Sequence, residues 1–181
     1  EVTREMRSVA KIVNFSIIYG KTAFGLAKEL NISQSEAKSY IEKYFAQYPK
    51  VKELEVNIIN SATEKGYVET IYGRKRDIPE LKSKNKNLKN AGERMAVNTV
   101  IQGSAADILK IVMVKLFKEF QNDSNIYMNL QVHDELLFEI KNEKVDEYLE
   151  KIKSIMENSV ELPKVKLKVN GNSGENWSQI K

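Results

Sequence analysis

The hydrophobic period of this chain changes near residue 121, and that change limits the folds it can adopt. Residues 90–120 repeat apolar side chains at the spacing of one helix face, namely Ile101, Ala105, Ile108, Leu109, Val112 and Leu116. After a polar turn at residues 121–125, apolar and polar side chains alternate in two runs, the first through Met128, Leu130 and Val132 and the second through Leu136, Phe138 and Ile140. A period near 3.6 predicts a helix, and a period of two predicts strands. We therefore expect a long helix followed by a hairpin whose strands meet at His133-Asp134.

Caps and helix breakers mark the other elements. Ser33 and Glu36 form a capping-box pattern that opens a helix, Pro49 starts the next helix, and Gly66 ends it because glycine tolerates positive φ. We expect helices to about residue 20 and at residues 24–30, 34–47, 51–64 and 145–160, and strands at residues 67–72 and 165–169. The predicted fold class is α+β, mostly helical, with part of an antiparallel sheet made of the hairpin and a final strand.

Residues 74–89 form a strongly basic stretch. The stretch contains seven basic and two acidic residues, and almost nothing apolar follows Leu81. Such a stretch is usually an ordinary solvated loop, and the alternative is a mobile loop that follows a phosphate backbone.

The composition excludes several classes of protein. The chain has 29 Lys+Arg against 25 Asp+Glu and a pI near 9.0, which favours an anionic partner. With no cysteine and one histidine, it has no disulfide framework and no thiolate or multi-histidine zinc centre, which leaves carboxylates as ligands for a hard cation. No apolar run approaches the roughly 20 residues of a membrane span, and the first residues lack a signal-peptide pattern. We expect a soluble, intracellular protein with no membrane partner.

Arg7, Lys11, Phe15 and Tyr19 recur every four residues in the first predicted helix. Four helical residues advance about 400°, so these side chains share one face. Two cations followed by two rings offer about 18 Å of surface on which phosphates can bind at one end and a flat ring can stack at the other. That arrangement matches a nucleoside triphosphate. The alternative is a solvated charged face with core aromatics, but apolar residues on the other faces already supply core contacts.

A second constellation lies at the predicted hairpin bend, where Gln131-Val132-His133-Asp134-Glu135 places the one histidine beside two carboxylates. Adjacent carboxylates repel, and a divalent cation or bulk water relieves the repulsion. Because neighbours on a strand point to opposite faces, we expect Asp134 to bind a metal directly and Glu135 to support it. The alternative is an exposed acidic turn.

Arg94, Asn98 and Gln102 extend the apolar face of the long helix toward its N-terminus. The face therefore changes from polar to apolar along one helix. Either a ligand binds the polar half or the helix emerges there into solvent, and the sequence leaves both interpretations open.

Taken together, these motifs resemble DNA polymerase family A, of the bacterial DNA polymerase I type, over almost the whole chain. The Arg-xxx-Lys-xxx-Phe-xxx-Tyr-Gly pattern of residues 7–20 resembles the family's fingers helix, and residues 131–135 resemble its catalytic hairpin. Residues 71–76 are similar to the following basic turn, residues 93–107 to the long palm helix, and Gly174-Glu175-Asn176-Trp177 to the usual C-terminus. The resemblance implies that residues 1–90 form the fingers and residues 91–181 the C-terminal part of the palm.

The resemblance also implies roles for individual residues. Arg7 and Lys11 would bind the triphosphate, Phe15 would pack on base and sugar, and Tyr19 would lie beside the template base. Primer-template DNA would be contacted by Arg74, Lys75, Arg76, Arg94, Asn98, Gln102, Gln131 and His133. The implied catalytic set is Asp134, Glu135, Lys11 and His133, with catalytic Mg²⁺ on Asp134 and Glu135.

The activity implied by this resemblance is template-directed addition of deoxynucleotides to a primer 3′ end, with release of pyrophosphate, in DNA replication and repair. Two Mg²⁺ ions would stabilise the attacking and leaving oxygens. We expect the complete enzyme to be a monomer in the bacterial nucleoid or in an organelle of bacterial origin.

Two features depart from the family pattern. The family takes another metal-binding aspartate from an Asp-Tyr-Ser-Gln-type motif before the fingers, and this sequence begins after that point. We therefore expect a C-terminal piece without thumb or exonuclease domain, inactive on its own. Ser16 stands where many relatives have glycine.

Two other functions fit part of the pattern. A single-subunit RNA polymerase has a similar fingers helix and His-Asp hairpin, but Phe15 and Glu135 favour a DNA polymerase. A non-catalytic helical DNA-binding module would need the basic stretch and the Arg94 face but not Asp134. An Asp134→Ala substitution therefore separates a binding module from a polymerase, because only a polymerase loses primer extension while it keeps DNA binding.

Overall fold

The computed structural model describes residues 2–180, which fold as two compact units divided between Ser104 and Ala105. One helix, α5 (Lys86–Phe120), runs through the boundary, and each unit is described by itself. The expected division into subdomains at residues 90 and 91 stays a prediction. None of the described helices is long and apolar enough to cross a membrane.

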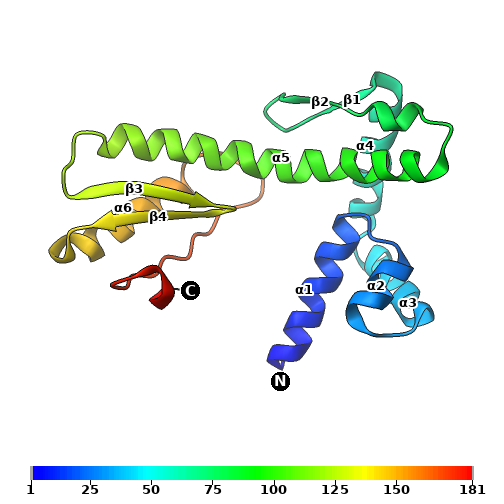
Figure 1. Cartoon of the computed structure of the whole chain (residues 1–181), viewed down its shortest axis with the longest axis horizontal. Helices are drawn as coiled ribbons and strands as arrows, with labels where there is room; N and C mark the ends of the chain where they lie inside the picture. Colours follow the sequence, from blue (N-terminus) through cyan, green and yellow to red (C-terminus); the bar gives the residue numbers. More distant parts are fainter. Residues whose placement is uncertain (1, 181) are drawn as a thin grey trace. The chain divides into compact units, whose positions relative to one another are not determined.

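The first unit begins with helices that are drawn in blue and cyan in Figure 1. They are α1 (Arg4–Ile18), α2 (Ala23–Leu30), α3 (Gln34–Gln47) and α4 (Pro49–Lys65). The ends of α3 and α4 follow the predicted caps. Both bonds of the Ser33–Glu36 capping box are present, and Gly66 closes α4 at φ 84°. The predicted local signals therefore mark the start of α3 and both ends of α4.

A small core holds α1, α2 and α3 together. Leu26, Ala27 and Ala37 are buried at its centre, and Ile12 and Val13 of α1 pack against them. The apolar residues of α1 thus face α2, which leaves the Lys11–Phe15 side of the helix uncovered by this core.

Residues 74–89 contain a strand, a 3₁₀ turn and the start of α5, so the prediction that the whole stretch is a loop is wrong. The stretch contains β2 (Lys75–Asp77), which pairs with β1 (Tyr67–Glu69) in an antiparallel ladder, and the 3₁₀ turn η1 (Pro79–Lys82). Ile78 and Leu81 are buried in a second core with Ala62, Val68 and Ala96. Two apolar side chains anchor a segment whose charge pattern alone indicated a loop.

The α5 helix begins four residues earlier than predicted, at Lys86, where the side chain of Asn85 accepts the Asn87 and Leu88 amides. Val112 and Leu116 of the predicted apolar stripe are buried, but Ala105 is exposed. The stripe is therefore interrupted at the point where the two units meet along the sequence.

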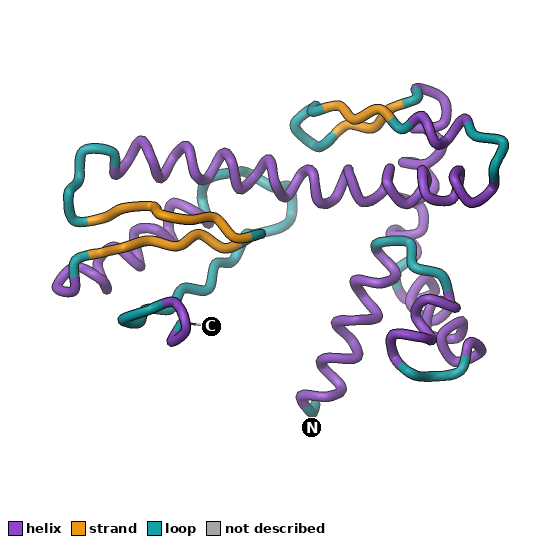
Figure 2. Tube along the Cα trace, in the orientation of Figure 1, coloured by secondary structure: helices purple, strands orange, loops and turns teal. Residues whose placement is uncertain are grey.

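The second unit packs a hairpin and one helix against the end of α5 (Figure 2). The hairpin is β3 (Ile126–Val132) and β4 (Glu135–Ile140), and the helix is α6 (Val145–Glu157). Val112, Leu116 and Phe120 meet Ile126 of β3 and Tyr148 and Ile152 of α6 in one buried cluster. The predicted hairpin and its two-residue loop are confirmed, since Val132 pairs with Glu135.

A register shift between Met128 and Leu130 changes which β3 side chains face the core. Met128 pairs with Phe138, but Leu130 pairs with Leu137 and Gln131 with Leu136. Paired residues share a face, so the extra residue Asn129 moves Leu130 and Val132 to the side opposite Met128. The expectation that Met128, Leu130 and Val132 lie on one face is therefore wrong.

The final strand predicted at residues 165–169 does not form among the described residues. That segment contributes only an isolated bridge between Leu162 and Val165. The Val169 amide instead donates to the Glu157 carboxylate, 3.0 Å away. An alternating pattern becomes a strand only where a partner edge is available to it, and sequence periodicity does not reveal the partner.

Candidate functional site

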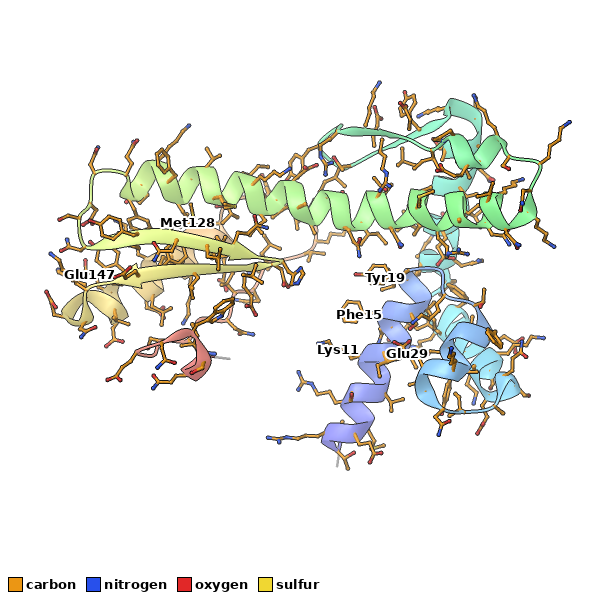
Figure 3. The ribbon with its side chains drawn as sticks, in the orientation of Figure 1. Lys11, Phe15, Tyr19, Glu29, Met128 and Glu147 are labelled. Carbon is orange, nitrogen blue, oxygen red and sulfur yellow. The ribbon has the colours of Figure 1, made fainter. Side chains whose placement is uncertain are left out.

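The predicted stripe on α1 is a surface of the helix rather than part of a core. Phe15 is 47% exposed, and its ring stacks on Tyr19 with the centroids 6.0 Å apart and the planes 14° from parallel. The Lys11 ammonium lies 5.9 Å from the Phe15 centroid, and Arg7 is exposed one turn earlier. Figure 3 shows Lys11, Phe15 and Tyr19 one after another along the helix. The stripe therefore has the order of cations and rings that the sequence predicts.

The end of α1 is fixed by its backbone. Gly20 has φ 68°, its amide donates to Ile17 O, and the Lys21 amide donates to Ser16 O at 2.8 Å. These two bonds form a Schellman motif, whose left-handed position glycine takes with the least strain. A Cβ on Gly20 would also lie 3.1 Å from Cγ of Arg94, so α5 approaches this turn closely.

A cavity of about 630 Å³ opens beside this turn. Lys11, Phe15 and Tyr19 line it from α1, and Arg94 and Asn98 line it from α5. The structure thus brings together five of the residues predicted for nucleotide and DNA binding, although about 80 residues of sequence separate α1 from Arg94. A pocket of this size is large enough for part of a nucleotide.

The same cavity contains a polar cluster that the sequence analysis missed. Oε2 of Glu29 on α2 accepts a hydrogen bond from Ser16 Oγ at 2.8 Å and binds Lys21 Nζ at 2.6 Å. Bonds from Lys21 and then Ser16 hold the pKa of Glu29 below its ordinary value. These residues are 8 and 13 positions apart from Glu29, outside any local helix spacing, so no periodic signal identifies them.

The predicted DNA contacts Arg74, Lys75 and Arg76 lie on and beside β2, and all three residues are exposed. Arg74 donates to Gly103 O at 3.1 Å, and Arg76 donates to Thr99 Oγ1 at 3.0 Å, both on α5. Lys75 lies over the Tyr67 ring. Arg74 and Arg76 therefore attach the β1–β2 ribbon to α5, whereas Lys75 contacts the ribbon itself. Gln102 is exposed on α5 but does not line the cavity.

The second unit places the other predicted residues at one tight turn. His133 has φ 54°, and the Gln131 amide group donates to His133 O at 3.0 Å, which braces the loop. His133, Asp134 and Glu135 are all exposed. Positive φ at the first loop residue is the geometry that hairpin turns with a II′ backbone require.

The carboxylates at this turn fit a partial Mg²⁺ site. Mg²⁺ commonly binds one or two protein carboxylates and completes its shell with water and substrate phosphates, and Asp134 and Glu135 supply two exposed carboxylates. Within residues 2–180, no group of three or more acidic, histidine or cysteine side chains surrounds a common point.

The comparisons with known proteins agree with this geometry. The sequence matches DNA polymerase family A over residues 1–179. The chain belongs to DNA polymerase family A. It is 48% identical to DNA polymerase I of Caldicellulosiruptor bescii, an alignment that covers 100% of this chain and 21% of that protein. It is 46% identical to DNA polymerase I of Borreliella burgdorferi, covering 99% of this chain and 20% of the relative.

A solved family A structure is also similar. The POL domain of Pol1 from M. smegmatis, in complex with DNA primer-template and dNTP, aligns with a TM-score of 0.86 at 38% identity. The alignment covers 93% of this chain and 30% of that one. The chain thus spans about a fifth of the length of its curated family A relatives.

Proposed function

We propose that this chain is the nucleotide-selecting and catalytic-hairpin part of a DNA-directed DNA polymerase that acts in DNA replication or repair. In the complete enzyme it would add deoxynucleotides to a primer 3′ end on a DNA template and release pyrophosphate. Family membership and the names of the relatives favour DNA over RNA synthesis.

The observation that carries the proposal is the cavity beside α1. Its lining combines the cation and rings of the predicted stripe with Arg94 and Asn98 of a distant helix. A non-catalytic DNA-binding module has no need of the exposed Lys11 and Phe15 and the half-buried Tyr19 in a row beside a cavity, whereas a nucleotide-selecting enzyme does.

Within this proposal, Arg7 and Lys11 bind the phosphates of the incoming nucleotide. Both are exposed on α1, and neither forms an ion pair with another residue in the described range 2–180. Their charge is therefore available to a polyanion, and charge-assisted bonds to phosphate are stronger than neutral ones. Phe15 would offer its exposed ring to the base and sugar, and Tyr19 would form the wall on the template side.

The hairpin would supply the carboxylates of the reaction. The primer 3′ oxygen forms a bond to the α-phosphorus while the bond from that phosphorus to the bridging oxygen breaks, the hydroxyl proton passes to solvent, and pyrophosphate leaves. Mg²⁺ supplies Lewis-acid stabilisation of the attacking and leaving oxygens when it is bound. Asp134 would hold it, Glu135 would support it, and Lys11 would neutralise charge that builds on the leaving pyrophosphate.

The DNA partner would follow α5 and the β1–β2 ribbon. Arg94 and Gln102 present exposed side chains along α5. Acceptors on the minor-groove edge are similar for all base pairs, so such groups can check pairing without reading sequence. Gln131 and His133 would lie near the primer end.

The test uses the complete polymerase that contains this chain, in a primer-extension assay. Asp134→Ala should abolish extension while primer-template affinity stays within about twofold, since one carboxylate at the reacting end contributes little to phosphate-backbone binding. Asp146→Ala is the matched control, because Asp146 is an exposed carboxylate in α6 of the same unit. A DNA-binding protein that shows no extension with any nucleotide would contradict the proposal.

A further inference from the structure

Glu29 joins two residues that flank the turn at the end of α1. Its Oε2 atom contacts Ser16 Oγ at 2.8 Å and Lys21 Nζ at 2.6 Å. Ser16 and Lys21 are already joined through the backbone by the Lys21 amide and Ser16 O. One carboxylate of α2 therefore binds the first and the last residue of the Schellman motif, Ser16 and Lys21.

The environment of this cluster makes its geometry specific. Ser16 is 5% exposed, so its hydroxyl has little access to water and depends on Glu29 as its acceptor. Losing that acceptor would leave a buried donor unsatisfied. The side chains of Lys21 and Glu29 are 41% and 39% exposed. An ion pair at the surface contributes little to stability, so the main effect of this contact is to fix where the two side chains lie.

The cluster is adjacent to the aromatic pair of the stripe. Ser16 follows Phe15 directly, and Lys21 lies two residues after Tyr19. Ser16, Lys21 and Glu29 all line the cavity that Phe15 and Tyr19 line (Figure 3 labels Glu29 close to α1). A shift of the turn would therefore move the Tyr19 ring and, through the stack, the ring of Phe15.

The cluster also controls the charge at the cavity. Among the described residues that line the cavity, Lys11, Lys21 and Arg94 are the cations and Glu29 is the one carboxylate. With Lys21 paired to Glu29, the charge that remains beside the stripe is that of Lys11 and Arg94, neither of which has an ion-pair partner in residues 2–180.

We propose that Glu29 is a positioning residue for nucleotide selection, which acts through Ser16 and Lys21 to hold the end of α1 so that Phe15 and Tyr19 keep their stacked arrangement. Glu29 itself touches neither phosphate nor base. The proposal rests on the proposed polymerase function, and it adds a residue that acts on substrate affinity through the geometry of the turn.

The first test is steady-state kinetics of single-nucleotide incorporation by the complete polymerase. Glu29→Gln should raise the KM for the nucleotide about threefold to tenfold and change kcat less, with primer-template affinity unchanged. Lys21→Met should have a similar effect, and the double variant should be no worse than either single one, because both changes break the same contact. Lys21→Arg keeps the cation and should restore the wild-type KM. The matched control is Glu42→Gln, which breaks the exposed Lys38–Glu42 pair on α3.

The second test does not depend on catalysis. Hydrogen exchange should become about fivefold faster at the Gly20 and Lys21 amides in Glu29→Gln and Ser16→Ala, and stay unchanged there in Glu42→Gln. Unchanged exchange at the turn overturns the proposal, and so does a nucleotide KM in Glu29→Gln equal to that of Glu42→Gln. If the wild-type enzyme extends primers while Glu29→Gln behaves like wild type, the positioning role fails and the polymerase function stands. If wild type does not extend, the polymerase function fails, and the exchange experiment still decides whether Glu29 holds the turn.

Discussion

Lys11 is the side chain on which phosphate binding depends most directly. Its ammonium lies beside the Phe15 ring, and no acidic side chain in residues 2–180 pairs with it. An exposed, unpaired cation next to a ring has little to gain from the folded chain itself, because a cation–π contact at an exposed site contributes only about 0.5–1 kcal/mol. Its substitution should therefore affect ligand binding more than folding.

Lys11→Ala in the complete enzyme should weaken nucleotide use by about 10- to 150-fold, which corresponds to loss of a charge-assisted contact worth about 1.5–3 kcal/mol. Affinity for primer-template should hardly change. Single-turnover incorporation at varied nucleotide concentration measures the effect. If DNA binding weakens as much as nucleotide use, the assignment of Lys11 to the triphosphate is wrong.

Phe15 has no hydroxyl, so it offers no hydrogen bond in place of a missing sugar hydroxyl. Phe15→Tyr should therefore raise incorporation of dideoxynucleotides relative to deoxynucleotides. The exposed ring leaves room for the added oxygen, so stability should be nearly unaffected. The measured quantity is the ratio of the two incorporation efficiencies. An unchanged ratio would show that Phe15 does not contact the sugar.

At the scale of elements, the turn between α5 and β3 is tied to α6. Asp123 accepts hydrogen bonds from the Tyr148 hydroxyl and from the amide of Asn125 at 3.0 Å. The bond from Tyr148, followed by that from Asn125, lowers the pKa of Asp123, and the same carboxylate raises the pKa of Tyr148. The turn between α5 and β3 is thus joined to α6 by one hydrogen-bonded pair.

Tyr148→Phe should lower the melting temperature, and the loss should depend on pH. A lowered carboxyl pKa stabilises the fold above the unfolded value of about 3.9, and this contribution disappears as pH falls through the folded pKa. A raised phenol pKa stabilises below the unfolded value of about 10 and is lost as pH rises through the folded one. The difference between variant and wild type should therefore be largest between these limits. Melting curves recorded from acid to alkaline pH test it, and a pH-independent difference would show that lost packing is the cause.

Gly66 ends α4 in the left-handed region at φ 84°. A Cβ there would meet only the end of Lys82, at 3.7 Å, so the cost of a side chain is conformational rather than steric. Gly66→Ala should destabilise the protein by about 1 kcal/mol. Gly66→Asn should cost less, since asparagine tolerates this region. Thermal unfolding of both variants measures the two losses of stability. Equal losses would show that the backbone conformation of residue 66 is not the cause.

At the scale of the whole molecule, local signals in the sequence were sufficient for most elements. The capping box at Ser33, the hairpin loop at His133-Asp134 and the stripe on α1 all follow from the pattern of residues within a few positions along the chain. The failures concern non-local contacts: Ile78 and Leu81 order the basic stretch by reaching a core built from other helices. Likewise, the Glu29 cluster depends on how α2 packs against α1, which no spacing within either helix encodes.

The 181 residues alone should not extend a primer. Residues 2–180 contain no group of three metal-binding side chains, and two Mg²⁺ ions need more carboxylates than the adjacent pair Asp134 and Glu135 supplies. A primer-extension assay on the purified, nuclease-free chain tests this. Template-dependent extension that Asp134→Ala abolishes would show that the chain already carries a sufficient metal site.

The extra residue in β3 has a consequence for how that strand tolerates substitution. Up to Met128 the even-numbered positions share the face of Phe138, whereas beyond Asn129 the odd-numbered Gln131 shares the face of Leu136. A saturation scan should therefore show its pattern of tolerance slipping by one position in mid-strand. Charged side chains should be costly at Ile126, which is buried, and far better accepted at Leu130, which is 44% exposed. A variant library designed on strict alternation would therefore assign the residues after Asn129 to the wrong face of the strand, and it would vary the wrong positions there.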